Sequence, residues 1–119
     1  FFGLEQYLVE GTEKIPPGNH QVRMEFAYDG GGVGKGGTVT LYIDGNPVGD
    51  GRVEQTEAFL FSADVTCDVG NEYGSPVTTD YARRAFTGEV EWVEIDLGLD
   101  DHNHMIKPED RLNLAMGIQ

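Results

Sequence analysis

The chain has little cysteine, few basic residues and no long apolar run. Its single cysteine, Cys67, excludes an intrachain disulfide bond and leaves the redox compartment open. No apolar stretch is long enough to span a membrane, and residues 1–6 lack the basic region of a signal peptide. Only 8 lysine and arginine residues stand against 21 acidic residues, and the formal net charge of −13 argues against nucleic acid or an anionic membrane as a partner. We therefore expect a soluble protein of undetermined compartment.

Length and glycine content predict one all-β domain. A chain of 119 residues can bury a core of its own. Seventeen glycines and few helical patterns are typical of a protein with many tight turns. Because the chain lacks an initiator methionine and begins in strand-like sequence, we expect it to be a piece of a longer protein.

The segment YDGGGVGKGG at residues 28–37 superficially resembles a phosphate-binding loop. A P-loop requires a glycine where Asp29 stands, a hydroxyl side chain where Gly36 stands, and a following helix. The next residues, 38–43, instead alternate with period two and are rich in β-branched side chains, which predicts a strand. The glycines are thus predicted to form a long connection between two strands.

Alternating apolar residues predict five or six short strands. The clearest covers residues 20–28 and is expected to be half-buried, with Val22, Met24, Phe26 and Tyr28 on one face. Asp44-Gly45 predicts a tight hairpin after the strand at 38–43, and Pro47 places the returning strand, residues 47–50, at a sheet edge. Further strands are predicted at residues 2–9, 58–65 and 89–97.

This pattern favours an antiparallel β-sandwich over residues 1–98. Residues 99–119 form a polar tail in which a short helix could begin at Pro108. The first strand has no preceding partner, so we expect the sandwich to be incomplete at its N-terminal edge. An open edge could pair with another copy of the chain.

Candidate catalytic and metal-binding groups are scattered. Cys67 would need a histidine beside it to act as a nucleophile, and neither His20 nor the pair His102 and His104 is placed there by the sequence, so a packed cysteine is the ordinary interpretation. Glu89 and Glu91 share a strand face, so an acid pair of the kind used by sandwich-fold glucanases is geometrically possible, but nothing else in the sequence supports it and a solvent-exposed face is the ordinary explanation. Residues with oxygen atoms suited to binding calcium lie around one loop: Asp64, Asp68, Asn71, Glu72 and Asp80. Their spacing is not that of an EF-hand, and solvated loop acids are the ordinary explanation for them.

Aromatic residues offer a sugar-binding hypothesis. Tyr73 and Tyr81 lie in loop sequence and are the better candidates for stacking on a sugar ring, and Tyr42 is also available. Trp92 lies between Val90 and Val93, and core packing is the expected role for it. A lectin-like carbohydrate-binding module therefore stays an alternative function.

Several segments together resemble the carboxy-terminal region of bacterial arylsulfatases. They are GNHQVRMEFAYDGGGVGKGGTVTLYIDG at 18–45, DVG at 68–70, GSPV at 74–77, Tyr81 and FTGEV at 86–90. The resemblance covers most of residues 4–98. It implies a concanavalin-like or laminin-G-like jelly roll that follows the catalytic domain of a sulfate-ester hydrolase in the bacterial cytoplasm or periplasm.

The resemblance also implies that this chain is not the catalytic part. Sulfatases carry Cys-x-Pro-x-Arg, whose cysteine becomes formylglycine beside a calcium ion, whereas Cys67 is followed by Asp-Val-Gly and lacks that proline and arginine. We expect no cofactor in this chain and formylglycine and calcium in the parent enzyme. Its partner would be the parent's catalytic domain, whose cleft it would help to shape. The candidate contact residues are Asp68, Asn71, Tyr73, Asp80 and Tyr81.

Overall fold

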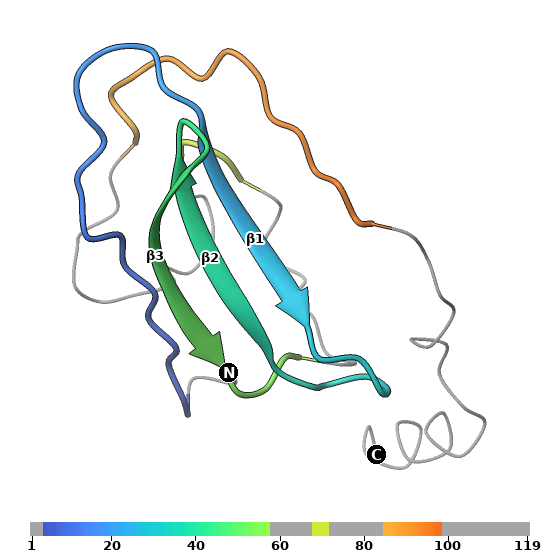
Figure 1. Ribbon diagram of the computed structural model, residues 1–119. Coiled ribbons are helices and arrows are strands. Elements are labelled where there is room, and N and C mark those ends of the chain that lie inside the picture. The colour runs from blue at the N-terminus through green and yellow to red at the C-terminus, as the bar shows by residue number, and fades with distance from the viewer. Residues whose placement is uncertain (1–3, 58–67, 72–84, 99–119) are drawn as a thin grey trace. The chain divides into compact units, whose positions relative to one another are not determined.

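The computed structural model describes residues 4–57, 68–71 and 85–98 (Figure 1). The first of these ranges belongs to one compact unit, and the other two belong to a second. Each unit is therefore described by itself.

The first unit contains a three-stranded antiparallel sheet in the order β1-β2-β3 (Figure 1). The strands are β1 (Val22–Tyr28), β2 (Gly37–Ile43) and β3 (Asn46–Val53). The described residues contain no helix, and none that could cross a membrane. The all-β prediction is confirmed for the described part of the chain, which shows this single sheet and not the second layer of a sandwich.

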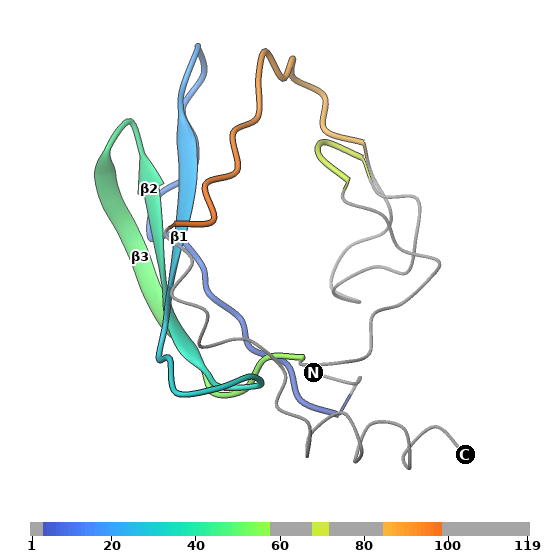
Figure 2. The same ribbon diagram turned by 90° about the vertical axis from the view of Figure 1, so that its right-hand side faces the viewer.

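The β1–β2 pairing confirms two predicted strands and the nature of the glycine-rich segment. Val22 pairs with Ile43 at one end and Tyr28 with Gly37 at the other, with no irregularity between. Residues 29–36 connect these two strands, and a strand rather than a helix follows them, so the rejection of a P-loop is correct. Figure 2 shows β1, β2 and their connection from the side.

A two-residue turn joins β2 to β3, as the Asp-Gly pair predicts. Asp44 and Gly45 have φ values of 51° and 80°, the left-handed conformation that both central residues of a type I′ hairpin turn require. β3 lies at an edge, as Pro47 indicates, but it runs to Val53 and is longer than predicted. A bulge opposite Leu41 and Tyr42 leaves Val48 without a ladder partner.

The register gives the sheet one apolar and one polar face. Residues directly opposite each other share a face. Met24 therefore lies beside Leu41, and Phe26 lies beside Val39, which is the one buried hydrophobic residue among those described, at 8% exposure. Arg23 lies beside Tyr42 on the opposite face.

The segment before β1 covers the β3 part of the apolar face instead of forming a strand. A Cβ atom on Gly49 would lie 2.4 Å from the Glu10 carbonyl oxygen, and one on Gly51 would lie 2.6 Å from a Val9 methyl carbon. The Thr12 amide donates to the Val48 carbonyl at 2.7 Å. The predicted strand at residues 2–9 is wrong for its described part, because these residues pack across β3 and do not join the ladder.

None of the described residues of the first unit covers the β1 part of the apolar face. We call its four side chains the β1 apolar strip; their exposures are 57% for Val22, 64% for Met24, 39% for Phe26 and 41% for Tyr28. The prediction that this strand is half-buried is therefore wrong in this structure, although the predicted strand itself is correct.

The described residues of the second unit contain bends and no strand. The Phe86 amide donates to the Gly70 carbonyl at 2.6 Å, which ties its two described ranges together. The strand predicted at residues 89–97 is not formed, and Trp92 is 59% exposed, so its predicted core role is wrong here. The strand predicted at 58–65 and the tail at 99–119 lie outside the described residues.

Replacing Gly49 by alanine should destabilise the sheet more than the same change at Gly51. The new methyl group at position 49 meets a backbone carbonyl, which cannot rotate away, whereas at position 51 it meets the side chain of Val9. Overpacking of this kind costs about 1–3 kcal/mol. We expect Gly49→Ala to lower the urea midpoint by a corresponding amount and Gly51→Ala to lower it less. Equal midpoints for the two variants would contradict the packing of the N-terminal segment on β3.

Candidate functional site

The residues predicted to form a contact site are only partly described. Asp68 is half-buried and Asn71 is exposed in the bend at residues 68–71. The other candidates, Tyr73, Asp80 and Tyr81, lie outside the described residues, as does Cys67. Of the five predicted contact residues, the structure thus places only Asp68 and Asn71, which lie in the same short described stretch. Within the described ranges, no group of three or more His, Cys, Asp or Glu residues is arranged to hold a metal ion.

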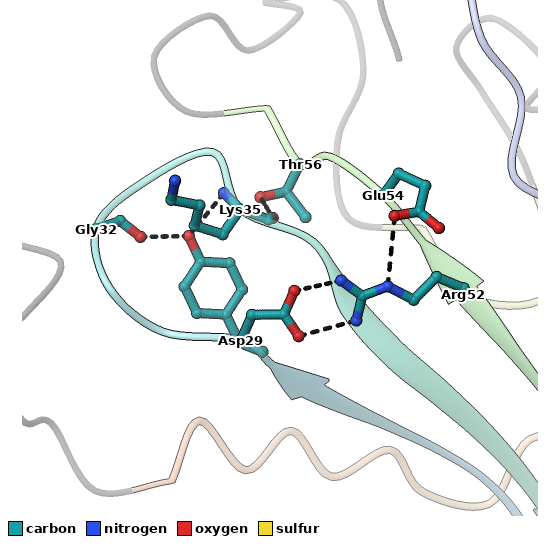
Figure 3. Close-up of polar contacts among 7 residues, drawn as sticks. Asp29, Gly32, Lys35, Arg52, Glu54 and Thr56 are labelled. Atoms are coloured by element: carbon teal, nitrogen blue, oxygen red, sulfur yellow. Dashed lines mark hydrogen bonds and ion pairs between the residues drawn. The ribbon is translucent and has the colours of Figure 1, made fainter.

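The glycine-rich connection is held closed by its own hydrogen bonds. The Tyr28 hydroxyl donates to the Gly32 carbonyl and accepts from the Lys35 amide at 3.0 Å. Outside this loop, the Thr56 hydroxyl donates to the Lys35 carbonyl at 2.7 Å (Figure 3). One backbone amide of the kind that would face a phosphate in a P-loop, that of Lys35, is thus already bound to the Tyr28 hydroxyl.

An ion pair joins the start of this connection to the far strand. The two terminal guanidinium nitrogens of Arg52 in β3 donate to the two carboxylate oxygens of Asp29, and the bond from Nη1 to Oδ1 is 2.8 Å long (Figure 3). The hydrogen bonds from Arg52 hold the pKa of Asp29 below its ordinary value, and those to Asp29 raise the pKa of Arg52. The Arg52 Nε also lies 3.6 Å from a Glu54 oxygen. Because both Asp29 oxygens are occupied, this carboxylate serves as a structural clamp.

The polar face carries a second charged group between β1 and β2. The Arg23 guanidinium lies 4.2 Å from the centre of the Tyr42 ring, and it is 3.0 Å from a Glu25 oxygen. The Tyr42 hydroxyl donates to Glu25 at 2.9 Å, and this bond is the main reason why the pKa of Tyr42 is raised. Tyr42 was a candidate for sugar stacking, but one face of its ring is occupied by Arg23.

His20 and Asp44 form a contact that the sequence analysis did not anticipate. The His20 Nδ1 lies 2.7 Å from one Asp44 oxygen, while the Gln21 amide donates to the other oxygen at 2.9 Å. The second ring nitrogen of His20 lies 3.4 Å from the Pro17 carbonyl oxygen. The hydrogen bond to Asp44 raises the pKa of His20, and its counterpart lowers the pKa of Asp44. The signal in the sequence was the aspartate of the Asp-Gly turn, but its partner is 24 residues away.

The β1 apolar strip is the feature of the described residues best suited to binding another surface. It lies directly beside the covered half of the same face, and the Phe26 and Tyr28 rings within it are 6.2 Å apart in a tilted arrangement. Solvent-exposed apolar side chains gathered in one patch mark a contact surface in soluble proteins. The arrangement can therefore bind an apolar surface, which is a different property from catalysis.

No protein-family model, no curated protein and no solved structure matches this chain significantly. The fold of the described residues is a small antiparallel β-sheet with one apolar face.

The pairing of His20 with Asp44 should give stability a maximum in mildly acidic solution. Because the pKa of His20 is raised from 6.5, its contribution is complete below that pH and is lost as the pH rises through the raised pKa. Because the pKa of Asp44 is lowered from 3.8, its contribution is lost as the pH falls through the lowered pKa.

An NMR titration of the His20 ring should therefore show a pKa above 6.5 in the unchanged chain and a lower one in Asp44→Asn. Asparagine tolerates the left-handed turn conformation, so the hairpin is retained in this variant. Asp29→Asn is the matched control, since Asp29 binds Arg52 and should leave His20 unaffected. An unchanged His20 titration in Asp44→Asn would contradict the contact.

Proposed function

We propose that this chain is a non-catalytic β-sheet segment of an arylsulfatase-like sulfate-ester hydrolase, and that it packs on the catalytic domain and shapes its cleft. The observation that carries the proposal is the β1 apolar strip, whose four side chains are exposed in the part of the chain that the structure describes. The identity of the parent enzyme rests on the resemblance of the 18–45 segment, which includes β1, the glycine-rich connection and the Asp-Gly turn.

A sheet with one apolar face is one layer of a structure that needs a second. Sheets bury such a face against helices or another sheet. Here the N-terminal segment covers β3 through contacts at Gly49 and Gly51, whereas no described segment gives Met24 and its neighbours on β1 an equivalent cover. A catalytic domain that covers this strip would complete the two-layer arrangement, and the jelly-roll architecture is part of the same proposal.

The polar contacts of the sheet support a positioning role. Two side-chain contacts link the strands at the two ends of the sheet: Asp29 with Arg52, and His20 with Asp44. They restrict movement of the strands that carry the strip. Tyr28 belongs to the strip and also to the glycine-rich connection, because its ring is part of the strip and its hydroxyl bonds to Gly32 and Lys35 of the connection. Contact with the strip would therefore also fix the position of this connection beside a cleft.

The first test is the coding sequence upstream of the codon for Phe1. We expect an in-frame Cys/Ser-x-Pro-x-Arg motif there, as the resemblance to sulfatases implies. A start codon close to Phe1, or hydrolysis of an aryl sulfate by the 119-residue chain well above the rate in buffer, would refute the proposal.

A paired substitution tests the docking surface itself. Met24→Glu places a carboxylate in the strip, whereas Thr38→Glu places one on the exposed polar face. A carboxylate left unpaired in an apolar interface should cost about 2 kcal/mol or more. In the complete gene product, we expect Met24→Glu to lower the unfolding temperature clearly and Thr38→Glu to change it little. In the 119-residue chain at concentrations where it is monomeric, Met24 is exposed and the two variants should unfold alike. A Met24→Glu variant that is as stable as Thr38→Glu in the complete protein would show that the strip is not covered.

A further inference from the structure

Within the described residues, β1 has a strand on one side only, and its other edge is open. The Gln21 carbonyl and the Asp29 amide both bond toward the β2 side, at 2.9 and 3.0 Å. Backbone groups alternate in direction along an antiparallel strand. Since the β1–β2 register is regular throughout, the amides and carbonyls of Val22, Met24, Phe26 and Tyr28 point away from β2, toward the open edge.

The two edges of the sheet differ in how they are protected. β3 carries Pro47 and a bulge, and its Val48 carbonyl already accepts both the amide and the hydroxyl of Thr12. Bulges, proline and covering segments are the usual devices that prevent a strand from pairing with a further chain. β1 has seven consecutive residues without proline, glycine or a bulge. A further strand would therefore be added at β1.

We propose that the open edge of β1 binds a second copy of this chain, with the two β1 strands antiparallel and Met24 opposite Met24. In this register, Arg23 lies opposite Glu25 of the partner subunit, and Glu25 lies opposite Arg23 of the partner subunit. Two ion pairs thus form from one two-fold contact. In each ion pair, the two facing residues make no backbone hydrogen bonds to each other. Side chains approach most closely across such non-hydrogen-bonded positions.

Neighbouring registers are disfavoured by charge. Sliding the partner strand one way places Arg23 opposite Arg23, and sliding it the other way places Glu25 opposite Glu25. Like charges directly opposite each other destabilise a strand pair.

The side chains that form the two ion pairs lie together on the polar face of β1. Arg23 and Glu25 lie 3.0 Å apart on the polar face, and Tyr42 contacts both of them. The interaction uses the backbone edge and the polar face of β1, whereas the proposed docking on a catalytic domain uses the β1 apolar strip. The dimer therefore goes beyond the proposed function and does not depend on it.

A charge-exchange experiment on the 119-residue chain tests the register. We expect the unchanged chain to show a concentration-dependent monomer–dimer equilibrium by sedimentation at about 0.15 M salt, where long-range repulsion between the acidic subunits is screened. Arg23→Glu places Glu opposite Glu, and Glu25→Arg places Arg opposite Arg, so each variant alone should dimerise about tenfold more weakly or worse. An equimolar mixture of the two variants should recover the affinity, because each then faces the opposite charge.

The mixture separates pairing between chains from a structural role within one chain. A merely structural loss would persist in the mixture, since each chain would keep its own defect. Asp50→Arg on β3 is the matched control, and it should leave the association unchanged. The double variant R23E/E25R keeps both charges within each chain and should dimerise like the unchanged chain, which provides a second readout if a single variant folds poorly. A chain that is monomeric up to about 1 mM, or a mixture that fails to recover, would overturn the dimer without affecting the docking proposal.

Discussion

The sheet depends most on Asp44, because this one residue makes contact with the start of β1 while forming the turn between β2 and β3. Its backbone amide bonds to the Gln21 carbonyl, its carboxylate accepts the Gln21 amide, and its other oxygen lies 2.7 Å from His20. The left-handed conformation that Asp44 adopts is tolerated by aspartate and suits the twist of the hairpin. The residue that forms the turn between β2 and β3 thus also aligns β1 with them.

At the opposite end of the sheet, Arg52 holds Asp29 across β2. Two such constraints leave little room for slippage, and a shift of one residue would turn every side chain of a strand to the other face. The register in turn places Gly49 and Gly51 on the apolar face, where their lack of side chains admits residues 9–11. Packing on one half of this face and exposure of the other half therefore follow from the same pairing.

The features that depend on neighbouring residues could be predicted from the sequence, and those that depend on distant partners could not. Alternation predicted β1 and β2, and Asp-Gly predicted the turn between β2 and β3, since both signals are local. The strand predicted at 2–9 failed because the glycines of β3 accept that segment as a packing layer. β3 was predicted too short because glycine is rare in strands. The contact between His20 and Asp44, and the exposure of Trp92, depend on tertiary arrangement that alternation does not encode.

The two surfaces offered by β1 are compatible because they point in different directions. A strand added at the edge bonds within the plane of the sheet, whereas a domain on the β1 apolar strip packs against its face. Pairing Met24 with Met24 about a two-fold axis would keep both strips on the same side of a continuous sheet, since residues opposite each other share a face. The apolar area available for docking would then double without any change in the strands that already exist. The uncovered face and the unprotected edge would thus be parts of one assembly, in which β1 lies at the centre rather than at the margin.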